Sequence, residues 1–238
     1  MKRIYFLFLS LCLLTFNGCY EHDFNERSVN QQSLRILVDA SHDGGVWWAP
    51  QAGIYDPTLQ HQGKKLADLL RQYGFTVDEL PSYTLITDSI LRNYDKVIRA
   101  GKYGSYQPGE IVAYRNLLQR GASMFLISEF LGSGETDELA ESIGIKFKGT
   151  HVGNVNLFGN STITAGATPF FFNAGSIVDN VSTNPNIQVL GWLSNNNQLP
   201  VMGTLNHPSS KILFLGEING IETTPQPLTD NIIKWLFF

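Results

Sequence analysis

Short apolar runs alternate with helical stripes through the first half of the chain. Each run of β-prone residues ends at a polar turn and is followed by apolar residues at helical spacing. The strands expected from this pattern are 34–38, 75–80, 96–100 and 124–127, and the helices are 56–74, 88–93, 108–121 and 135–143. Strands and helices that alternate in this way predict a parallel sheet with right-handed crossover connections.

Local signals mark the ends of two of these helices. Asp56 can cap the first helix, Pro57 suits its first position, and Gly74 can end it. Pro108 opens the third helix and places Glu110 in its first turn. These signals agree with the helical spacing, so both segments are expected to be helices.

The pattern changes from Gly149 to about Asn186. This stretch is rich in Gly, Asn, Ser, Thr and Phe and has no helical stripe, so we expect loops and short strands. Beyond it, the expected antiparallel strands are 188–193, 200–205 and 211–215. A last helix begins near Pro227. The predicted fold is one α/β domain over 34–238, with a doubly wound, mostly parallel, flavodoxin-like sheet and antiparallel strands added in its C-terminal half.

The first 18 residues predict an export signal. Lys2 and Arg3 precede an apolar run from Ile4 to Leu14 that is too short to span a bilayer. Thr15-Phe16-Asn17-Gly18-Cys19 then resembles a bacterial lipobox, which implies a lipid on the sulfur of Cys19 and removal of residues 1–18. A secretory signal without lipid is the alternative. We expect a lipid-anchored protein of the cell envelope, in the outer membrane of a Gram-negative cell, with a flexible tether over 19–33.

Cysteine use and charge narrow the classes of function. The two cysteines are Cys12, inside the segment to be removed, and Cys19. If the lipobox is correct, no cysteine nucleophile is left. The net charge of the whole chain is −4, and removal of Lys2 and Arg3 makes it −6. An acidic chain without basic clusters is a poor nucleic-acid binder, so we expect no nucleic-acid partner.

Several segments together resemble the class I glutamine amidotransferase-like superfamily. They are the SHDGG turn after the first strand, the Pro-capped helix, RGASMFLIS, STITAG and PVMGTLNHPSSKILFLGEING, within Leu34 to Trp235. Catalytic members of that superfamily carry a cysteine on the turn after the central strand, where this chain has Ser128 and Glu129. A carboxylate does not perform amide attack, and Ser128 lies in no G-x-S-x-G elbow. The resemblance therefore implies a branch without amidotransferase activity.

Polar residues follow four of the expected strands. Because ligands bind at the carboxyl ends of strands in open α/β sheets, these residues predict one ligand site. The expected ligand-binding residues are Asp39, Ser41, His42, Asp43, Arg99, Ser128, Glu129, Glu217 and Asn219, with Trp47 and Trp48 as an aromatic wall. Lys102 and Tyr103 follow the same strand as Arg99. This mixture suits a small polar ligand, such as a carbohydrate or a peptide-like group.

The polar residues after the first strand can also have purely structural roles. Asp39, Ser41 and Asp43 are common turn residues whose side chains bond local backbone. Asp39, His42 and Asp43 lack a regular metal-ligand spacing, so no metal or other cofactor is expected.

The residues after the other strands have structural alternatives too. Glu129 can form a structural ion pair with Arg99, and Trp47 and Trp48 can serve only for packing.

Two functions stay open from the sequence. The first is a catalytically inert domain that binds a small polar ligand or a protein partner in the envelope. The second is an envelope hydrolase, with Glu129, Asp39 and His42 as candidate acid–base groups.

Overall fold

The computed structural model describes residues 34–43, 63–80, 82–194, 198–217, 224 and 226–238. The strands are β1 (Arg35–Asp39), β2 (Thr76–Leu80), β3 (Lys96–Ala100), β4 (Ser123–Ile127), β5 (Phe147–Phe158), β6 (Phe170–Val178), β7 (Ile187–Leu193), β8 (Leu199–Asn206) and β9 (Lys211–Leu215). The helices are α1 (Lys64–Gln72), α2 (Asp88–Leu91), α3 (Pro108–Gln119), α4 (Glu138–Ser142) and α6 (Gln226–Phe237). Among these helices none has the length and apolarity that a membrane crossing requires.

All nine strands form one mixed sheet in the order β2-β1-β3-β4-β9-β8-β7-β5-β6. Pairing is parallel from β2 through β9 and antiparallel from β9 through β6. The prediction of a doubly wound, mostly parallel, flavodoxin-like sheet is therefore wrong. The strand 211–215 is the main cause, because β9 pairs parallel with β4 and antiparallel with β8, which joins the two halves of the sheet.

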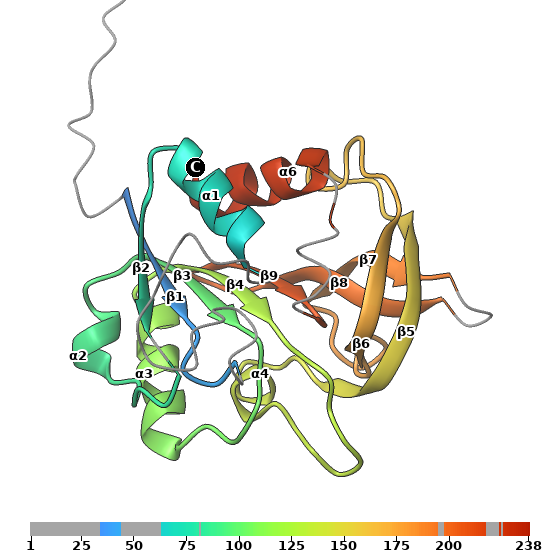
Figure 1. Ribbon diagram of the computed structural model, residues 1–238. Helices are drawn as coiled ribbons and strands as arrows, with labels where there is room; N and C mark the ends of the chain where they lie inside the picture. The colour runs from blue at the N-terminus through green and yellow to red at the C-terminus, as the bar shows by residue number, and fades with distance from the viewer. Residues whose placement is uncertain (1–33, 44–62, 81, 195–197, 218–223, 225) are drawn as a thin grey trace, which may run out of the picture.

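Helices lie on both faces of the parallel part of the sheet (Figure 1). Alternation along β1 explains this arrangement, because Ile36 and Val38 belong to the apolar cluster with α1 and α6. Leu37 points to the opposite face and belongs to the cluster with α2, α3 and α4. Burial of both faces gives β1, β3 and β4 nearly continuous apolar sequences, which is why these strands were predictable.

The segment expected to hold loops and short strands contains two long strands, β5 and β6. β5 and β6 form an antiparallel ribbon at one end of the sheet (Figure 1). Gly149, His151 and Gly153 occupy inward positions of β5, between buried Phe147 and buried Val155. These small or polar residues hide the apolar alternation that would have marked a strand.

Two glycines allow β6 to lie against the end of β9. The backbone N–H of Ser176 donates to the carbonyl oxygen of Gly216 over 2.8 Å. A Cβ on Gly216 would lie 1.8 Å from the backbone oxygen of Ser176, and one on Gly175 would lie 2.2 Å from the Cβ of Glu217. No larger residue fits at this close approach without a backbone shift.

Candidate functional site

A cavity of about 270 Å³ lies beside the carboxyl ends of β2, β1 and β3. Its walls are Ser41 and His42 after β1, residues 82–85 after β2, residues 103–105 after β3, and Gln107 with Glu110 at the start of α3. The strand order reverses at β1, since β2 lies on one side of it and β3 on the other. Ligands of open sheets with parallel strands bind at such a reversal.

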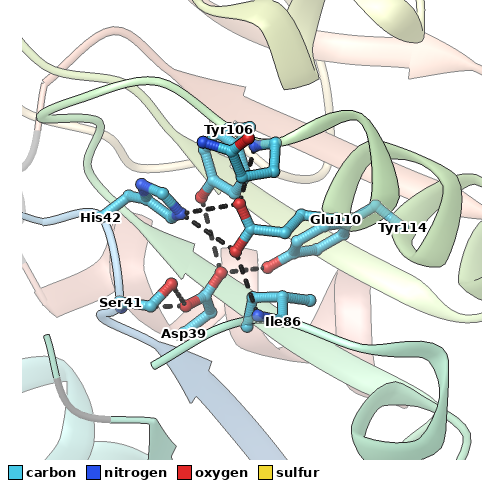
Figure 2. Close-up of polar contacts among 8 residues, drawn as sticks. Asp39, Ser41, His42, Ile86, Tyr106, Glu110 and Tyr114 are labelled. Carbon is cyan, nitrogen blue, oxygen red and sulfur yellow. Dashed lines mark hydrogen bonds and ion pairs between the residues drawn. The ribbon is translucent and has the colours of Figure 1, made fainter. Parts of the chain in front are cut away.

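His42 and Glu110 both line this cavity and contact each other (Figure 2). The Nε2 of His42 lies 3.2 Å from both carboxylate oxygens of Glu110. The side chain of Glu110 is 2% exposed, and that of His42 is 17% exposed. The imidazole also lies over the ring of Tyr106, with the ring centroids 4.0 Å apart. His42 is therefore fixed on two sides while it still reaches the cavity.

Glu110 also joins two walls of the cavity. Its Oε1 accepts from the backbone N–H of Ile86 over 3.0 Å, and its Oε2 accepts from that of Gln107 over 2.8 Å. Burial raises the pKa of Glu110, but the N–H groups of Gln107 and Ile86 and the nearby His42 outweigh it, so the pKa is lowered. An ionised carboxylate thus holds the start of α3, the segment after β2 and His42 together.

Asp39 accepts hydrogen bonds beneath the cavity. Its Oδ1 accepts from the backbone N–H of Ser41 over 2.9 Å and from the Ser41 hydroxyl over 2.5 Å. Its Oδ2 accepts from the hydroxyl of Tyr114 over 2.5 Å and from that of Tyr106 over 3.5 Å. Burial and the negative charge of Asp39 raise the pKa of both tyrosines. These contacts give Asp39 a structural role in shaping the turn that carries His42.

Arg99 is buried next to these residues and lies over the ring of Tyr106, with its Cζ 5.9 Å from the ring centroid. Its Nη2 donates to Asp137 over 2.5 Å, and the hydroxyl of Ser128 donates to the same carboxylate oxygen over 3.1 Å. Asp137 also caps α4 through the backbone N–H of Ala140. In the described part of the chain the ion pair of Arg99 is thus with Asp137, whereas the structural alternative considered for Glu129 had paired Arg99 with that residue.

The other expected site residues lie in several places. Asp43 is buried and accepts from the hydroxyl of Ser82 over 3.1 Å. Glu129 is buried, and its carboxylate accepts from the N–H of Phe130 over 3.2 Å. Glu217 is buried at the end of β9. Cys19, Trp47, Trp48 and Asn219 lie outside the described residues. Of the expected ligand-binding residues that the structure describes, Ser41 and His42 line the cavity.

The sequence did not point to Glu110 or Tyr83 as part of this site. Glu110 was taken only as a first-turn acid of its helix, although Gln107 and Glu110 form a capping box that places the carboxylate at the helix start. Tyr83 lies on the cavity wall, where it is 97% exposed and has a φ of 68°. Tyr103 lies on another wall and is 62% exposed; it was among the residues expected to converge there after the third strand.

Comparisons with known proteins show similarity of fold. No family model matches the sequence, and no curated protein matches it. The structure is similar to the mmIFT52 N-terminal domain, with 15% identity and a TM-score of 0.61 over 85% of this chain and 95% of that one. It is also similar to a putative ThuA-like protein from Bacteroides uniformis, with 14% identity and a TM-score of 0.56 over 86% of this chain and 91% of that one.

A third similar structure belongs to a larger protein. It is a β-galactosidase from Bacillus circulans, with 13% identity and a TM-score of 0.53. The match covers 86% of this chain and 30% of the β-galactosidase chain. These findings correct the resemblance to the class I glutamine amidotransferase-like superfamily, because the neighbours are ThuA-like proteins and the IFT52 domain and the sheet is mixed. Identities this low show the fold alone.

Proposed function

We propose that this protein is a lipoprotein of the cell envelope whose domain binds a small polar ligand, carbohydrate or peptide-like, in the cavity beside β2, β1 and β3. The observation that carries the proposal is a cavity of about 270 Å³ whose lining includes the half-buried His42 paired with the buried Glu110. Its size is at the lower end for ligand pockets, which suits one sugar ring or a dipeptide.

The rim of the cavity supports the same ligand class. Tyr83 and Tyr103 present aromatic surface to solvent beside this polar pair of residues. The positive φ of Tyr83 is unfavourable for a bulky residue, and such strain is concentrated at binding sites. An aromatic face can pack on the C–H face of a sugar ring or on a peptide plane, while the polar pair bonds hydroxyl or amide groups.

The binding proposal is tested with the full-length chain in detergent. Ligand-detected NMR is run with glucose, galactose, mannose, N-acetylglucosamine, diglycine and dialanine. At least one compound should show saturation transfer that His42→Ala abolishes. His207→Ala is the matched control, since His207 lines a different cavity of about 240 Å³ beside the end of α3. Transfer that is absent for every compound, or that survives His42→Ala, contradicts the proposal.

The place of the protein in the cell is a separate part of the proposal. The lipobox-like sequence ending at Cys19 and the polar stretch over 19–33 support a lipid anchor and a tether. This placement would present the cavity to solutes outside the cytoplasm. Extraction of cells expressing the full-length chain tests it, because a lipid-anchored protein stays with the membrane until detergent is added.

A hydrolase is the second candidate, and the His42–Glu110 contact favours it. A carboxylate 3.2 Å from an imidazole is the arrangement that orients a histidine as a general base. Of the acid–base groups expected from the sequence, only His42 lines the cavity. Product analysis after long incubation of the bound compound or its glycosides and esters separates the two candidates, because a binding domain leaves them unchanged.

A further inference from the structure

We infer that the polar lining of the cavity accepts hydrogen bonds, so that it selects an uncharged polyhydroxy ligand or its amine and rejects the phosphorylated form. This inference rests on the proposed function, because it specifies the ligand of the same cavity. It follows from where the protons lie on His42 and Ser41 and from the charges around them.

Glu110 determines which nitrogen of His42 carries the proton. The carboxylate is ionised and accepts the backbone N–H groups of Ile86 and Gln107. An ionised carboxylate can only accept, so the contact at 3.2 Å requires the proton to be on Nε2 of His42. In the neutral imidazole the other nitrogen, Nδ1, then has a lone pair. No residue in the described part of the chain bonds this nitrogen, so it is available to a ligand in the cavity.

Ser41 presents an acceptor for a similar reason. Its hydroxyl donates to Oδ1 of Asp39 over 2.5 Å, and Ser41 is one of the residues that line the cavity. The hydroxyl is therefore engaged as a donor, and its remaining lone pairs can only accept. Two neighbouring residues on the same turn thus offer lone pairs, which favours ligand groups that bring their own O–H or N–H donors.

The charges near the cavity act in the same direction. Glu110 lines it, and Asp39 is buried beneath it, with hydroxyl and backbone N–H groups as its donors. No Lys or Arg is among the described residues that line the cavity. Of the basic residues in and after β3, Arg99 bonds Asp137 and also lies over the ring of Tyr106, and the Nζ of Lys102 lies 3.9 Å from Glu138. A phosphate would therefore lie near the carboxylates of Glu110 and Asp39, with no Lys or Arg among the described lining residues to bond it.

The experiment has two independent measurements on the full-length chain in detergent. The first is a long-range ¹H–¹⁵N NMR correlation on protein labelled at its five histidines, with His42 assigned by its loss in His42→Asn. Its nitrogen shifts should show the proton on Nε2. The second is titration with glucose, glucosamine, glucose 1-phosphate and glucose 6-phosphate. Glucose or glucosamine should bind at least tenfold more tightly than either phosphate.

The same two measurements are repeated on the variant Glu110→Gln and compared with those on the original chain. The new amide can donate to Nε2 of His42, which would move the proton to Nδ1 and turn that nitrogen into a donor. The variant should therefore show a changed ¹⁵N pattern and a smaller preference against phosphate. If Glu110→Gln does not fold, the measurements on the unaltered chain still decide the inference.

The outcomes separate this inference from the proposed function. A proton on Nδ1, or phosphates that bind as tightly as glucose, overturns the inference but leaves a ligand site in the cavity. If none of the four compounds binds, the inference is overturned. If the wider set of sugars and dipeptides fails as well, the proposed function falls too.

Discussion

Replacement of Glu110 by alanine should destabilise the protein through the hydrogen bonds that its carboxylate accepts. The substitution leaves the N–H of Ile86, which is buried, and the N–H of Gln107, which is partly buried, without their acceptor. It also removes the capping box of α3. A buried donor left unsatisfied costs about 1–3 kcal/mol, and water can reach Gln107 in part, so we expect a loss of about 2–4 kcal/mol.

Urea unfolding followed by tryptophan fluorescence measures this loss. Glu141→Ala is the matched control, because Glu141 is an exposed glutamate in a helix, and its free energy of unfolding should stay within about 0.5 kcal/mol of the original. A loss below about 1 kcal/mol for Glu110→Ala would refute the view that Glu110 holds the cavity walls together.

The pH dependence follows from the direction of the pKa shift. The pKa of Glu110 in the folded protein is below its ordinary value of 4.5. A lowered pKa contributes stability that is present above the ordinary value and is lost as the pH falls through the lower, folded value. The original chain should therefore lose stability in this acidic range more steeply than Glu110→Gln, in which residue 110 does not titrate. Parallel acid profiles of the two proteins would contradict the assignment.

Three further predictions concern other parts of the molecule. Tyr114→Phe should lower the free energy of unfolding by about 1.5–3 kcal/mol, because it removes the hydroxyl that donates to buried Asp39. Because the pKa of Tyr114 is raised in the folded protein, the contribution of Tyr114 to stability is present below its ordinary pKa of 10.0 and is lost as the pH rises through the higher, folded value. Urea unfolding checks both points, with Tyr83→Phe as the control at an exposed position. Gly216→Ala should cost at least about 3 kcal/mol or prevent folding, whereas Gly109→Ala, with open space for a Cβ, should be tolerated in the same thermal unfolding assay. Cys19→Ala should abolish labelling by radioactive palmitate and release the protein from membranes; persistent labelling would show that Cys19 is not the lipidated residue.

Some elements were predictable because their signals are local. The strand 96–100 is β3 with the same bounds, since buried Val97 and Ile98 form an apolar run that polar residues precede. The helix from Pro108 is α3, because a proline at its start and an apolar stripe are both visible in the sequence. Gly74 follows α1 with a φ of +87°, as its expected role at the helix end requires.

Other features depend on contacts between distant residues. β5 escaped prediction because Gly149 and Gly153 fill inward positions, where only the partner strand shows that the segment is extended. The direction of β9 depends on its two neighbours, and its own sequence is compatible with either pairing.

Contacts between distant residues also explain why the site was only partly predicted from the sequence. His42 was identified because it follows the first strand, but its partner Glu110 is 68 residues further along the chain. Tyr83 joins the cavity through a hydrogen bond from its backbone N–H to the carbonyl oxygen of Ser41, a contact that no spacing in the sequence indicates. A polar turn can thus be recognised from the sequence, whereas the opposite walls of its cavity come from the fold.

The most direct test of the central claim is to locate a bound ligand. Backbone amide chemical shifts of the full-length chain in detergent are mapped while the compound that shows saturation transfer is added. The account predicts that the largest changes fall on Ser41, His42, Tyr83 and Tyr103, around the cavity beside β2, β1 and β3. Changes centred on His207 and Arg115 at the other cavity would contradict it.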